Sequence, residues 1–269
     1  MEWFESIILG FIQGLTEFLP VSSSGHLEIG KVLLGVQAKE DLMFTTMVHA
    51  ATVLSTIVVF RKQILQILKG FFQFKYNDET DYVFKIAVSM IPIMIVGLFF
   101  KDQVEALFGT IRVVGFALLA TSALLFFSDF ASKRAPGAMS RTGYARNGIS
   151  YCQALVVGLS QALAVIPGLS RSGTTISTGL ICGVRRDVMA QFSFLMVLIP
   201  ILGESFLEVV GGEFASSSIG ALPLVLGFVS AFVSGLFACK VMIALVKKAK
   251  LSWFAIYCLI AAASIFIFA

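Results

Sequence analysis

The sequence contains little charge. Only 13% of its 269 residues are Asp, Glu, Lys or Arg, whereas 58% are hydrophobic; a soluble domain usually has about 25% charged residues. The mean hydropathy of +0.93 over the whole length is too high for a protein with a single buried apolar core. Most of the surface must therefore face a lipid bilayer, and the composition predicts an integral membrane protein.

Cysteine and histidine are scarce, and several familiar catalytic motifs are missing. The four cysteines lie in apolar stretches without a CxxC pair, so we expect small hydrophobic side chains rather than disulfides or structural zinc. The sequence has no two-histidine zinc pattern, no GxSxG nucleophile elbow and no Walker loop. These patterns would have indicated a zinc hydrolase, an α/β-hydrolase or a P-loop nucleotidase, and none of these is indicated.

Six segments are apolar enough to cross a bilayer, and each approaches the length of about 20 residues that a spanning helix needs. The first five residues, Met1-Glu-Trp-Phe-Glu5, lack the basic region of a cleavable signal peptide. We therefore expect the first apolar stretch to belong to the mature protein. The predicted spanning helices are residues 43–60, 85–100, 110–128, 188–207, 219–240 and 251–268.

Two other regions, residues 4–34 and 150–182, are apolar at both ends and polar in the middle. The breaks read Glu17-Phe-Leu-Pro-Val-Ser-Ser-Ser-Gly-His26 and Ile166-Pro-Gly-Leu-Ser-Arg-Ser-Gly-Thr-Thr175. Pro and Gly interrupt a helix, and the polar side chains are too costly to face lipid. Irregular backbone at membrane depth is tolerated only where protein or water surrounds it. We therefore predict two re-entrant hairpins, each a helix–loop–helix.

The two hairpins resemble each other. Gly14-Leu-Thr-Glu17 is similar to Gly158-Leu-Ser-Gln161, and Ser24-Gly25 to Ser172-Gly173. One hairpin followed by three spans is an odd number of crossings, so a duplication would be inverted in the membrane. The predicted fold is an all-α polytopic membrane protein: one domain over 1–269, with six transmembrane helices and two re-entrant hairpins, built from inverted repeats at about 1–130 and 145–269.

Positive charge is distributed unevenly between the predicted loops. Most of the 20 Lys and Arg residues fall on the side opposite the entrance of the first hairpin. The positive-inside rule makes that side cytoplasmic, so both termini are predicted to lie outside the cytoplasm. No base-reading or stacking motif accompanies the basic clusters, and we expect no nucleic-acid partner.

Glu17 and the serines after it form the first candidate site. Gln13 lies one helical turn before Glu17, on the same helix face. An ionisable residue at membrane depth indicates a function; alternatively, Glu17 only pins the hairpin by hydrogen bonds. The run Ser22-Ser23-Ser24-Gly25-His26 offers hydroxyls that become nucleophiles when a base, His26 or Glu17, takes the proton. The alternative is that one serine caps a helix.

The second candidate site is the run Pro167-Gly-Leu-Ser-Arg-Ser-Gly-Thr-Thr175. It offers a fixed cation, four hydroxyls and flexible backbone where a helix should begin. Backbone N–H groups at a helix N-terminus and a forked guanidinium both suit an anion, and phosphate is the natural candidate. The alternative is that Arg171 reaches the membrane interface and pairs with lipid head groups.

Two further points stay open in the sequence. His49 lies within a predicted span, Met47-Val-His-Ala-Ala51; a hydrogen-bonded core histidine is the simpler interpretation, and a role at the site is the alternative. A divalent cation, Mg²⁺ or Ca²⁺, needs only one or two carboxylates together with substrate oxygens. Glu17 is the carboxylate that we expect to hold it.

The two breaks together look familiar. Gln13-Gly-Leu-Thr-Glu-Phe-Leu-Pro-Val-Ser-Ser-Ser-Gly-His26 and Pro167-Gly-Leu-Ser-Arg-Ser-Gly173 resemble the undecaprenyl-diphosphate phosphatase (bacitracin-resistance) family, and the resemblance covers essentially the whole chain. It implies an enzyme of the bacterial inner membrane that removes the terminal phosphate of undecaprenyl diphosphate with the help of a divalent cation. The product is the lipid carrier for peptidoglycan and other wall polymers.

The resemblance also implies roles for single residues. The family's acidic motif falls on Gln13 and Glu17; its first position is Glu or Gln, and the Gln present here leaves one carboxylate. That departure disfavours a mechanism with two carboxylates on one metal. The implied catalytic residues are Glu17, Ser23, His26 and Arg171, with substrate contacts at Gln13, Ser22, Ser24, Ser170, Ser172, Gly173 and Thr175, and Glu17 as the metal ligand.

We expect the diphosphate of a polyprenyl lipid to lie between the two hairpin tips, with its tail in the bilayer. Ser23 is the first choice of nucleophile, with Glu17 and His26 handling protons; attack by His26 itself or by an activated water is the alternative. A different class of function is a carrier that moves a lipid phosphate across the membrane, since re-entrant inverted repeats also build transporters. A structural scaffold would not need Glu17, His26 and Arg171 in apolar surroundings.

Overall fold

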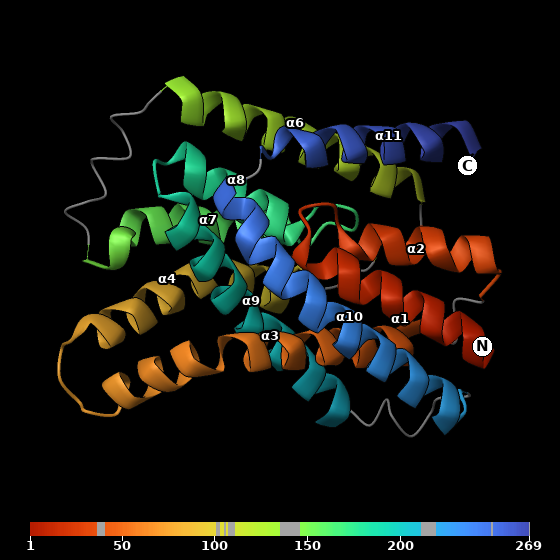
Figure 1. Ribbon diagram of the computed structural model, residues 1–269, viewed down its shortest axis with the longest axis horizontal. Helices are drawn as coiled ribbons and strands as arrows, with labels where there is room; N and C mark the ends of the chain where they lie inside the picture. Colours follow the sequence, from red (N-terminus) through yellow and green to blue (C-terminus); the bar gives the residue numbers. More distant parts are fainter. Residues whose placement is uncertain are drawn as a thin grey trace.

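The computed structural model describes residues 1–36, 41–100, 103–104, 106, 111–134, 146–210, 219–248 and 250–268. Within these residues it consists of helices and loops without a strand, which confirms the predicted all-α class (Figure 1). In chain order the elements are α1 (Trp3–Phe18), α2 (Ser23–Leu34), α3 (Asp41–Phe71), α4 (Asp78–Phe99), α6 (Ile111–Arg134), the 3-10 turn η3 (Arg146–Gly148), α7 (Tyr151–Leu163), α8 (Arg171–Ile181), α9 (Arg186–Val210), α10 (Ala221–Lys248) and α11 (Ser252–Phe268).

Each predicted span corresponds to one long helix. Five of these helices, α3, α4, α6, α9 and α10, are long and apolar enough to cross a membrane. The sixth, α11, is equally apolar but has 17 residues, or about 26 Å at 1.5 Å per residue, slightly less than the hydrocarbon core of about 30 Å. The protein is thus a polytopic membrane protein, and a crossing by α11 stays a prediction.

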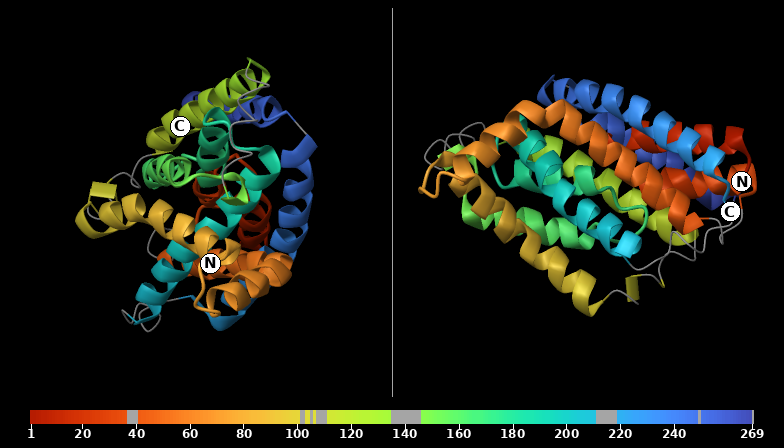
Figure 2. Two further views of the ribbon diagram at one scale, coloured as in Figure 1. Left: turned by 90° about the vertical axis from the view of Figure 1, so that its left-hand side faces the viewer. Right: turned by 90° about the horizontal axis from the view of Figure 1, so that it is seen from below.

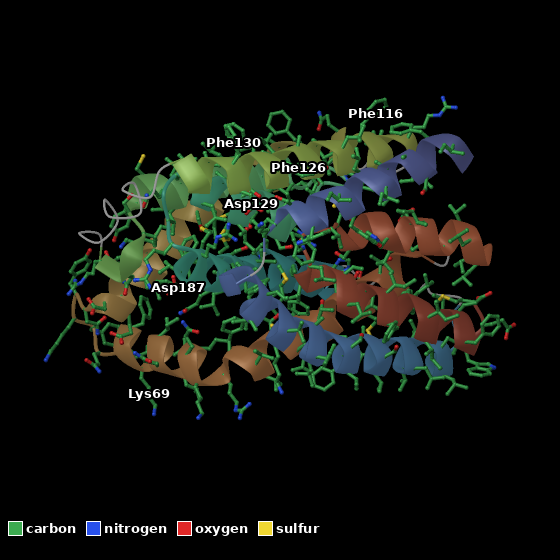
Figure 3. The ribbon with its side chains drawn as sticks, turned by 45° about the horizontal axis from the view of Figure 1, so that its top comes forward. Lys69, Phe116, Phe126, Asp129, Phe130 and Asp187 are labelled. Carbon is green, nitrogen blue, oxygen red and sulfur yellow. The ribbon has the colours of Figure 1, made fainter. Side chains whose placement is uncertain are left out.

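The outer surface of the bundle is apolar, as a lipid-facing surface should be. On α6, the rings of Phe116, Phe126 and Phe130 are exposed on the outside of the bundle, where Phe116 also packs edge-to-face on Phe266 of α11, whereas Asp129 points inward (Figure 3). The buried Asp129 carboxylate accepts hydrogen bonds from Arg186 at 2.7 Å and from the backbone N–H of Ser252 at 2.8 Å. The inward charge is therefore paired, and it ties α6 to the starts of α9 and α11.

The helix α3 is longer than the predicted span 43–60, because it continues to Phe71. Charge ends the apolar run at Arg61, but the residues that follow, Lys-Gln-Ile-Leu-Gln-Ile-Leu-Lys69, are good helix formers. The first glycine comes only at Gly70. The predicted end at residue 60 was wrong because hydropathy indicates the end of the lipid-facing part of a helix, and a helix can continue beyond it into water.

Both predicted re-entrant hairpins are present as helix–loop–helix units. The pair α1–α2 enters from the end of the molecule that carries both termini, and α7–α8 enters from the opposite end, so the two tips meet in the middle (Figures 1 and 2). The tips touch directly, since the Ser172 hydroxyl donates to the carbonyl of Leu19 at 3.1 Å. A polar site is thereby enclosed in the middle of the helix bundle.

Each hairpin packs its first helix against a span of the other half of the chain. Helix α1 lies along α10, and α7 lies along α4. At both contacts a glycine lets the backbones approach: a side-chain carbon at Gly14 would collide with the carbonyl of Ala231, and one at Gly158 with the carbonyl of Ser89. These contacts occupy matching places in the predicted repeats at 1–130 and 145–269, and the duplication itself stays a prediction.

Candidate active site

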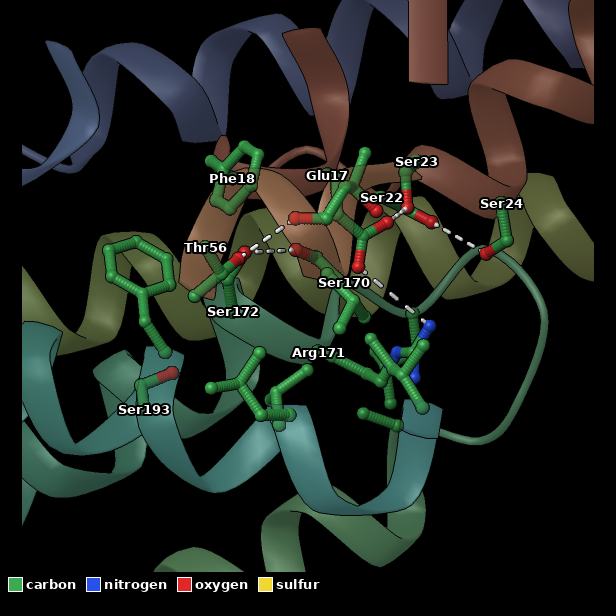
Figure 4. Close-up of a pocket in the computed structure, with 18 residues that line it drawn as sticks. Glu17, Phe18, Ser22, Ser23, Ser24, Thr56, Ser170, Arg171, Ser172 and Ser193 are labelled. Atoms are coloured by element: carbon green, nitrogen blue, oxygen red, sulfur yellow. Dashed lines mark hydrogen bonds and ion pairs between the residues drawn. The ribbon is translucent and has the colours of Figure 1, made fainter. Parts of the chain in front are cut away.

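A cavity lies where the two hairpin tips meet. It encloses about 590 Å³ of empty space, its mouth included, between the tips, α3 and α9 (Figure 4). Its polar wall consists of Glu17, Ser22, Ser23, Ser24, Ser170, Arg171 and Ser172, all of which were predicted as site residues. The structure therefore brings together seven of the predicted residues, from two segments separated by more than 140 positions in the chain.

The first tip is shaped by Pro20 and Ser22. Helix α1 ends at Phe18, and Leu19 is extended, as expected for the residue before a proline. Ser22 then has a left-handed backbone (φ 70°), and its hydroxyl accepts from the N–H of Gly25 at 3.3 Å as the cap of α2. Helix capping therefore accounts for the Ser22 hydroxyl, in line with the alternative that one serine of the run caps a helix. The hydroxyls of Ser23 and Ser24 do not cap α2.

Glu17 and Ser23 form the closest polar pair in the cavity. The Ser23 hydroxyl donates to Oε2 of Glu17 at 2.5 Å (Figure 4). The amide of Gln13 donates to the same oxygen at 2.8 Å. The carboxylate side chain is 9% exposed. A hydroxyl bonded to a carboxylate that can take its proton is the arrangement that an activated serine nucleophile requires.

The second tip brings a cation to this pair. Ser170 caps α8 by accepting from the N–H of Gly173 at 3.0 Å, so Arg171 is the first residue of the helix. The Arg171 guanidinium lies 3.9 Å from Oε1 of Glu17, across the cavity from Ser23 (Figure 4). The alternative position of Arg171, at the membrane interface with lipid head groups, is not what the structure shows. An anion bound at the N-terminus of α8 would be stabilised both by the positive end of the helix dipole and by the charge of the Arg171 guanidinium.

Sequence comparison places this constellation among known proteins. Residues 6–264 match the family described as bacitracin resistance protein BacA. The chain belongs to that family. It is 56% identical over 265 residues to a protein of Parabacteroides distasonis, with 97% of this chain and 96% of the relative covered. It is 54% identical over 264 residues to a protein of Bacteroides fragilis, with the same two coverages. Both relatives are named undecaprenyl-diphosphatase.

More distant relatives share the whole length. A protein of Christiangramia forsetii is 50% identical over 272 residues, which cover 100% of this chain and 99% of the relative, and it too is named undecaprenyl-diphosphatase. The resemblance inferred from the two breaks is thereby confirmed at the level of the family. Within this BacA-family chain, the remaining predicted residues can now be placed.

Four predicted residues do not line the cavity. Gln13 is fully buried, and its amide donates a hydrogen bond to the Glu17 carboxylate from the side away from the cavity. Gly173 lies against the first tip, since a side-chain carbon added to it would meet the Pro20 side chain at 3.3 Å. The Thr175 hydroxyl is bonded to Ser193 of α9 at 2.7 Å. These three hold the tips and α9 in place, so direct substrate contact by them is not what the geometry indicates.

His26 is the fourth, and both of its ring nitrogens have other partners. Nδ1 donates to the carbonyl of Ser22 at 2.7 Å, because a carbonyl can only accept. Nε2 of the neutral ring then accepts from the hydroxyl of Tyr257 on α11 at 2.7 Å, and the two rings stack with centroids 5.5 Å apart. The structure does not bring His26 to Ser23 or Glu17, and its predicted part in proton transfer stays a prediction.

The cavity also has a polar side on α3, whose Thr52 and Thr56 were not predicted from the sequence, whereas a site role for His49 was one of the two interpretations that the sequence left open. Thr52 and Thr56 line it, and His49 one turn earlier reaches Glu17, with Nε2 lying 3.8 Å from Oε2. The spacing 49, 52, 56 puts all three on one face of a helix. A polar stripe in an otherwise apolar span was the available signal. The opposite wall is apolar and comes mainly from α9: Phe194, Val197, Leu198 and Ile201.

Glu17 also fits the tentative place for a divalent cation. Within the described part of the chain, no three His, Cys, Asp or Glu side chains gather as a metal-binding group. Oε1 of Glu17, however, accepts no hydrogen bond from the described residues and faces Arg171 at 3.9 Å. One carboxylate oxygen beside several hydroxyls suits an ion that takes most of its ligands from phosphate and water. A metal held by two carboxylates would not fit, because residue 13 is Gln.

Proposed function

We propose that this protein is an integral membrane phosphatase that hydrolyses undecaprenyl diphosphate to undecaprenyl phosphate and inorganic phosphate. The observation that carries the proposal is the Ser23 hydroxyl, bonded to Glu17 at 2.5 Å and facing Arg171 in a cavity at membrane depth. The relatives named undecaprenyl-diphosphatase support it. Such an enzyme recycles the lipid carrier for cell-wall synthesis and gives resistance to bacitracin.

The first step would transfer the terminal phosphoryl group to Ser23. As the Ser23 oxygen forms its bond to the terminal phosphorus, the bridging P–O bond breaks and undecaprenyl phosphate leaves with the electron pair. The hydroxyl proton passes to Oε2 of Glu17 along their existing hydrogen bond. Arg171 and the N–H groups at the start of α8 would neutralise charge on the phosphoryl oxygens.

The second step would release inorganic phosphate. Water attacks the phosphorus of the phosphoserine; as its oxygen bonds to phosphorus, the P–O bond to Ser23 breaks and both water protons leave on the phosphate, as H2PO4⁻. The Ser23 oxygen takes back the proton held by Glu17, which restores the hydroxyl and the carboxylate. Direct attack on the diphosphate by a water that Glu17 orients is the alternative route, and it differs in leaving Ser23 unmodified. Either route uses one carboxylate and one guanidinium, which this cavity provides.

The two walls of the cavity suggest how the lipid lies. The hairpin wall carries the charge and the hydroxyls, whereas the α9 wall presents apolar side chains such as Phe194 and Leu198. A diphosphate would occupy the first, and the polyprenyl chain would pass along the second toward the bilayer. A divalent cation, Mg²⁺ or Ca²⁺, bound through Glu17 would supply further positive charge to the phosphates.

The setting would be the bacterial inner membrane, with both termini outside the cytoplasm. The two termini do lie at the same end of the molecule (Figure 2), as an arrangement with an even number of crossings requires. Their assignment to the outer side rests on the positive-inside rule. In that orientation, the hairpin that carries Ser23 enters from outside.

A second candidate function is transport of the lipid phosphate. The observation in its favour is that the hairpins enter from opposite ends and meet at one polar cavity (Figure 1), an arrangement also used by alternating-access carriers. A carrier needs an anion site but no nucleophile. It should therefore keep substrate binding and movement after Ser23→Ala, whereas a hydrolase that uses Ser23 loses turnover.

The test is phosphate release from a polyprenyl diphosphate by the detergent-purified protein. It is run with Mg²⁺, with Ca²⁺ and with chelator, for the wild type, Glu17→Ala and Arg171→Ala. We expect cation-dependent release by the wild type and a loss of at least about 100-fold in kcat/KM for both variants. Absence of release by well-folded wild-type protein would reject the phosphatase and favour the carrier.

A further inference from the structure

His49 is a partly buried polar residue of α3 that lies outside both hairpins. Its side chain is 15% exposed, and Nδ1 donates to the Thr45 carbonyl one turn earlier at 2.8 Å. That bond fixes the ring plane and leaves Nε2 as the nitrogen that points away from its own helix. Nε2 lies 3.8 Å from Oε2 of Glu17. Because Nδ1 already carries the proton donated to Thr45, Nε2 attracts this oxygen either as the second N–H of the imidazolium or, in the neutral ring, through a bridging water that donates to both atoms.

The two oxygens of the Glu17 carboxylate have unlike surroundings. Oε2 has Ser23 at 2.5 Å, Gln13 at 2.8 Å and His49 at 3.8 Å. Oε1 has Arg171 at 3.9 Å. Gln13 and Ser23 both belong to the first hairpin. His49, on α3, is the partner of Oε2 that comes from another part of the chain.

The support for His49 is itself anchored to the first hairpin. The ammonium of the buried Lys31, on α2, donates to the Thr45 hydroxyl at 3.3 Å and to Glu28 at 3.0 Å. The Thr45 carbonyl in turn holds His49. Glu17 on α1 is therefore the charged group that faces His49, and the Lys31–Glu28 pair on α2 faces its support. Arg171 on α8 lies on the other oxygen of Glu17.

We propose that His49 is a positioning residue that keeps Oε2 of Glu17 aimed at the Ser23 hydroxyl. The inference rests on the proposed phosphatase function. When a diphosphate enters, Arg171 turns from Oε1 toward the phosphoryl oxygens, and the carboxylate loses its contact with the second hairpin. Oε2 then keeps its orientation through Gln13 and His49. A carboxylate that rotates away by even about 1 Å loses most of its value as a base for Ser23.

This role predicts different results for two substitutions. Glutamine can place an amide N–H donor near Oε2, so His49→Gln should preserve the orientation. Alanine removes the contact, so His49→Ala should lower kcat by about 10- to 100-fold while KM changes by less than about threefold. Leu54→Ala is the matched control, since Leu54 is on the same helix with its side chain 40% exposed on the outside.

The experiment measures kcat and KM for phosphate release from a polyprenyl diphosphate by the whole protein in detergent, together with thermal unfolding. The expected result is a low kcat for His49→Ala, near wild-type values for His49→Gln and Leu54→Ala, and similar unfolding midpoints. A wild-type kcat in His49→Ala, or equal losses in Ala and Gln, would overturn the positioning role while leaving the phosphatase intact. No release by the wild type would overturn the phosphatase and this inference with it.

Discussion

At the scale of single residues, the two carboxylate oxygens of Glu17 have different partners. Oε2 receives the Ser23 and Gln13 hydrogen bonds, and Oε1 faces the Arg171 guanidinium. In the proposed reaction, the serine proton would leave toward Oε2, and Oε1 would stay beside the phosphate. This division depends on residue 13 being a donor, since an amide N–H orients Oε2 without adding charge.

Gln13→Glu tests that dependence. A second carboxylate one turn before Glu17 would repel it, unless a proton or a cation lies between them. We expect phosphate release to become more cation-dependent, with the half-activating Mg²⁺ concentration lowered about tenfold. The measurement is a titration of activity with free Mg²⁺, with the exposed Gln73→Glu as control. Superimposable curves for Gln13→Glu and wild type would reject a cation at Glu17.

Tyr257→Phe tests what holds His26. The substitution removes the hydroxyl that donates to Nε2 at 2.7 Å but keeps the ring that stacks on the imidazole. If His26 must be held for catalysis, kcat should fall by about 3- to 10-fold with little change in stability, as expected for loss of one hydrogen bond. An unchanged kcat would show that the Tyr257 contact has no part in the reaction.

Among the elements, the two hairpins set the position of the site, and glycines set the position of the hairpins. Helix α1 meets α10 at Gly14, and α7 meets α4 at Gly158, with the backbones in direct contact. The tips then join through the Ser172–Leu19 hydrogen bond. Because both hairpins are short helices wedged between spans, a small outward shift of either would separate Ser23 from Arg171.

Gly14→Ala and Gly158→Ala should therefore damage both stability and activity. The new carbon collides with a backbone carbonyl that cannot move aside, and overpacking of this kind costs about 1–3 kcal/mol. The control is Gly97→Ala on α4, where nothing lies within 4 Å of the added carbon. Unfolding midpoints in detergent should fall for the first two variants only. Equal midpoints for all three would contradict the close packing.

For the molecule as a whole, the sequence predicted the architecture better than the details of the site. Long apolar runs locate the spans, and polar breaks within such runs locate the hairpins, because side chains that face lipid must be apolar. The partner of His26 could not be predicted, since Tyr257 lies 231 positions away and reaches it only through the packing of α11. Thr52 and Thr56 were missed because hydroxyls in a span often bond to their own helix, as Thr56 does to the Thr52 carbonyl at 3.0 Å.

Orientation in the membrane is a property of the whole molecule, and cysteine labelling measures it. In a variant with the four native cysteines replaced by serine, Leu33→Cys marks the end with the termini and Lys69→Cys the opposite end. Both positions are exposed. A membrane-impermeant thiol reagent added to intact cells should label position 33 and not position 69. The reverse pattern would invert the proposed topology.

The most direct test of the account is the kcat of Ser23→Ala for phosphate release from a polyprenyl diphosphate. The control is Ser264→Ala, an exposed serine on α11 that bonds only to its own helix at 3.0 Å. If Ser23 is the nucleophile, Ser23→Ala should lose at least about 1,000-fold in kcat, the scale seen when a nucleophile is removed, and the control should keep the wild-type rate. A Ser23→Ala enzyme that keeps its rate within about tenfold would contradict the serine as nucleophile.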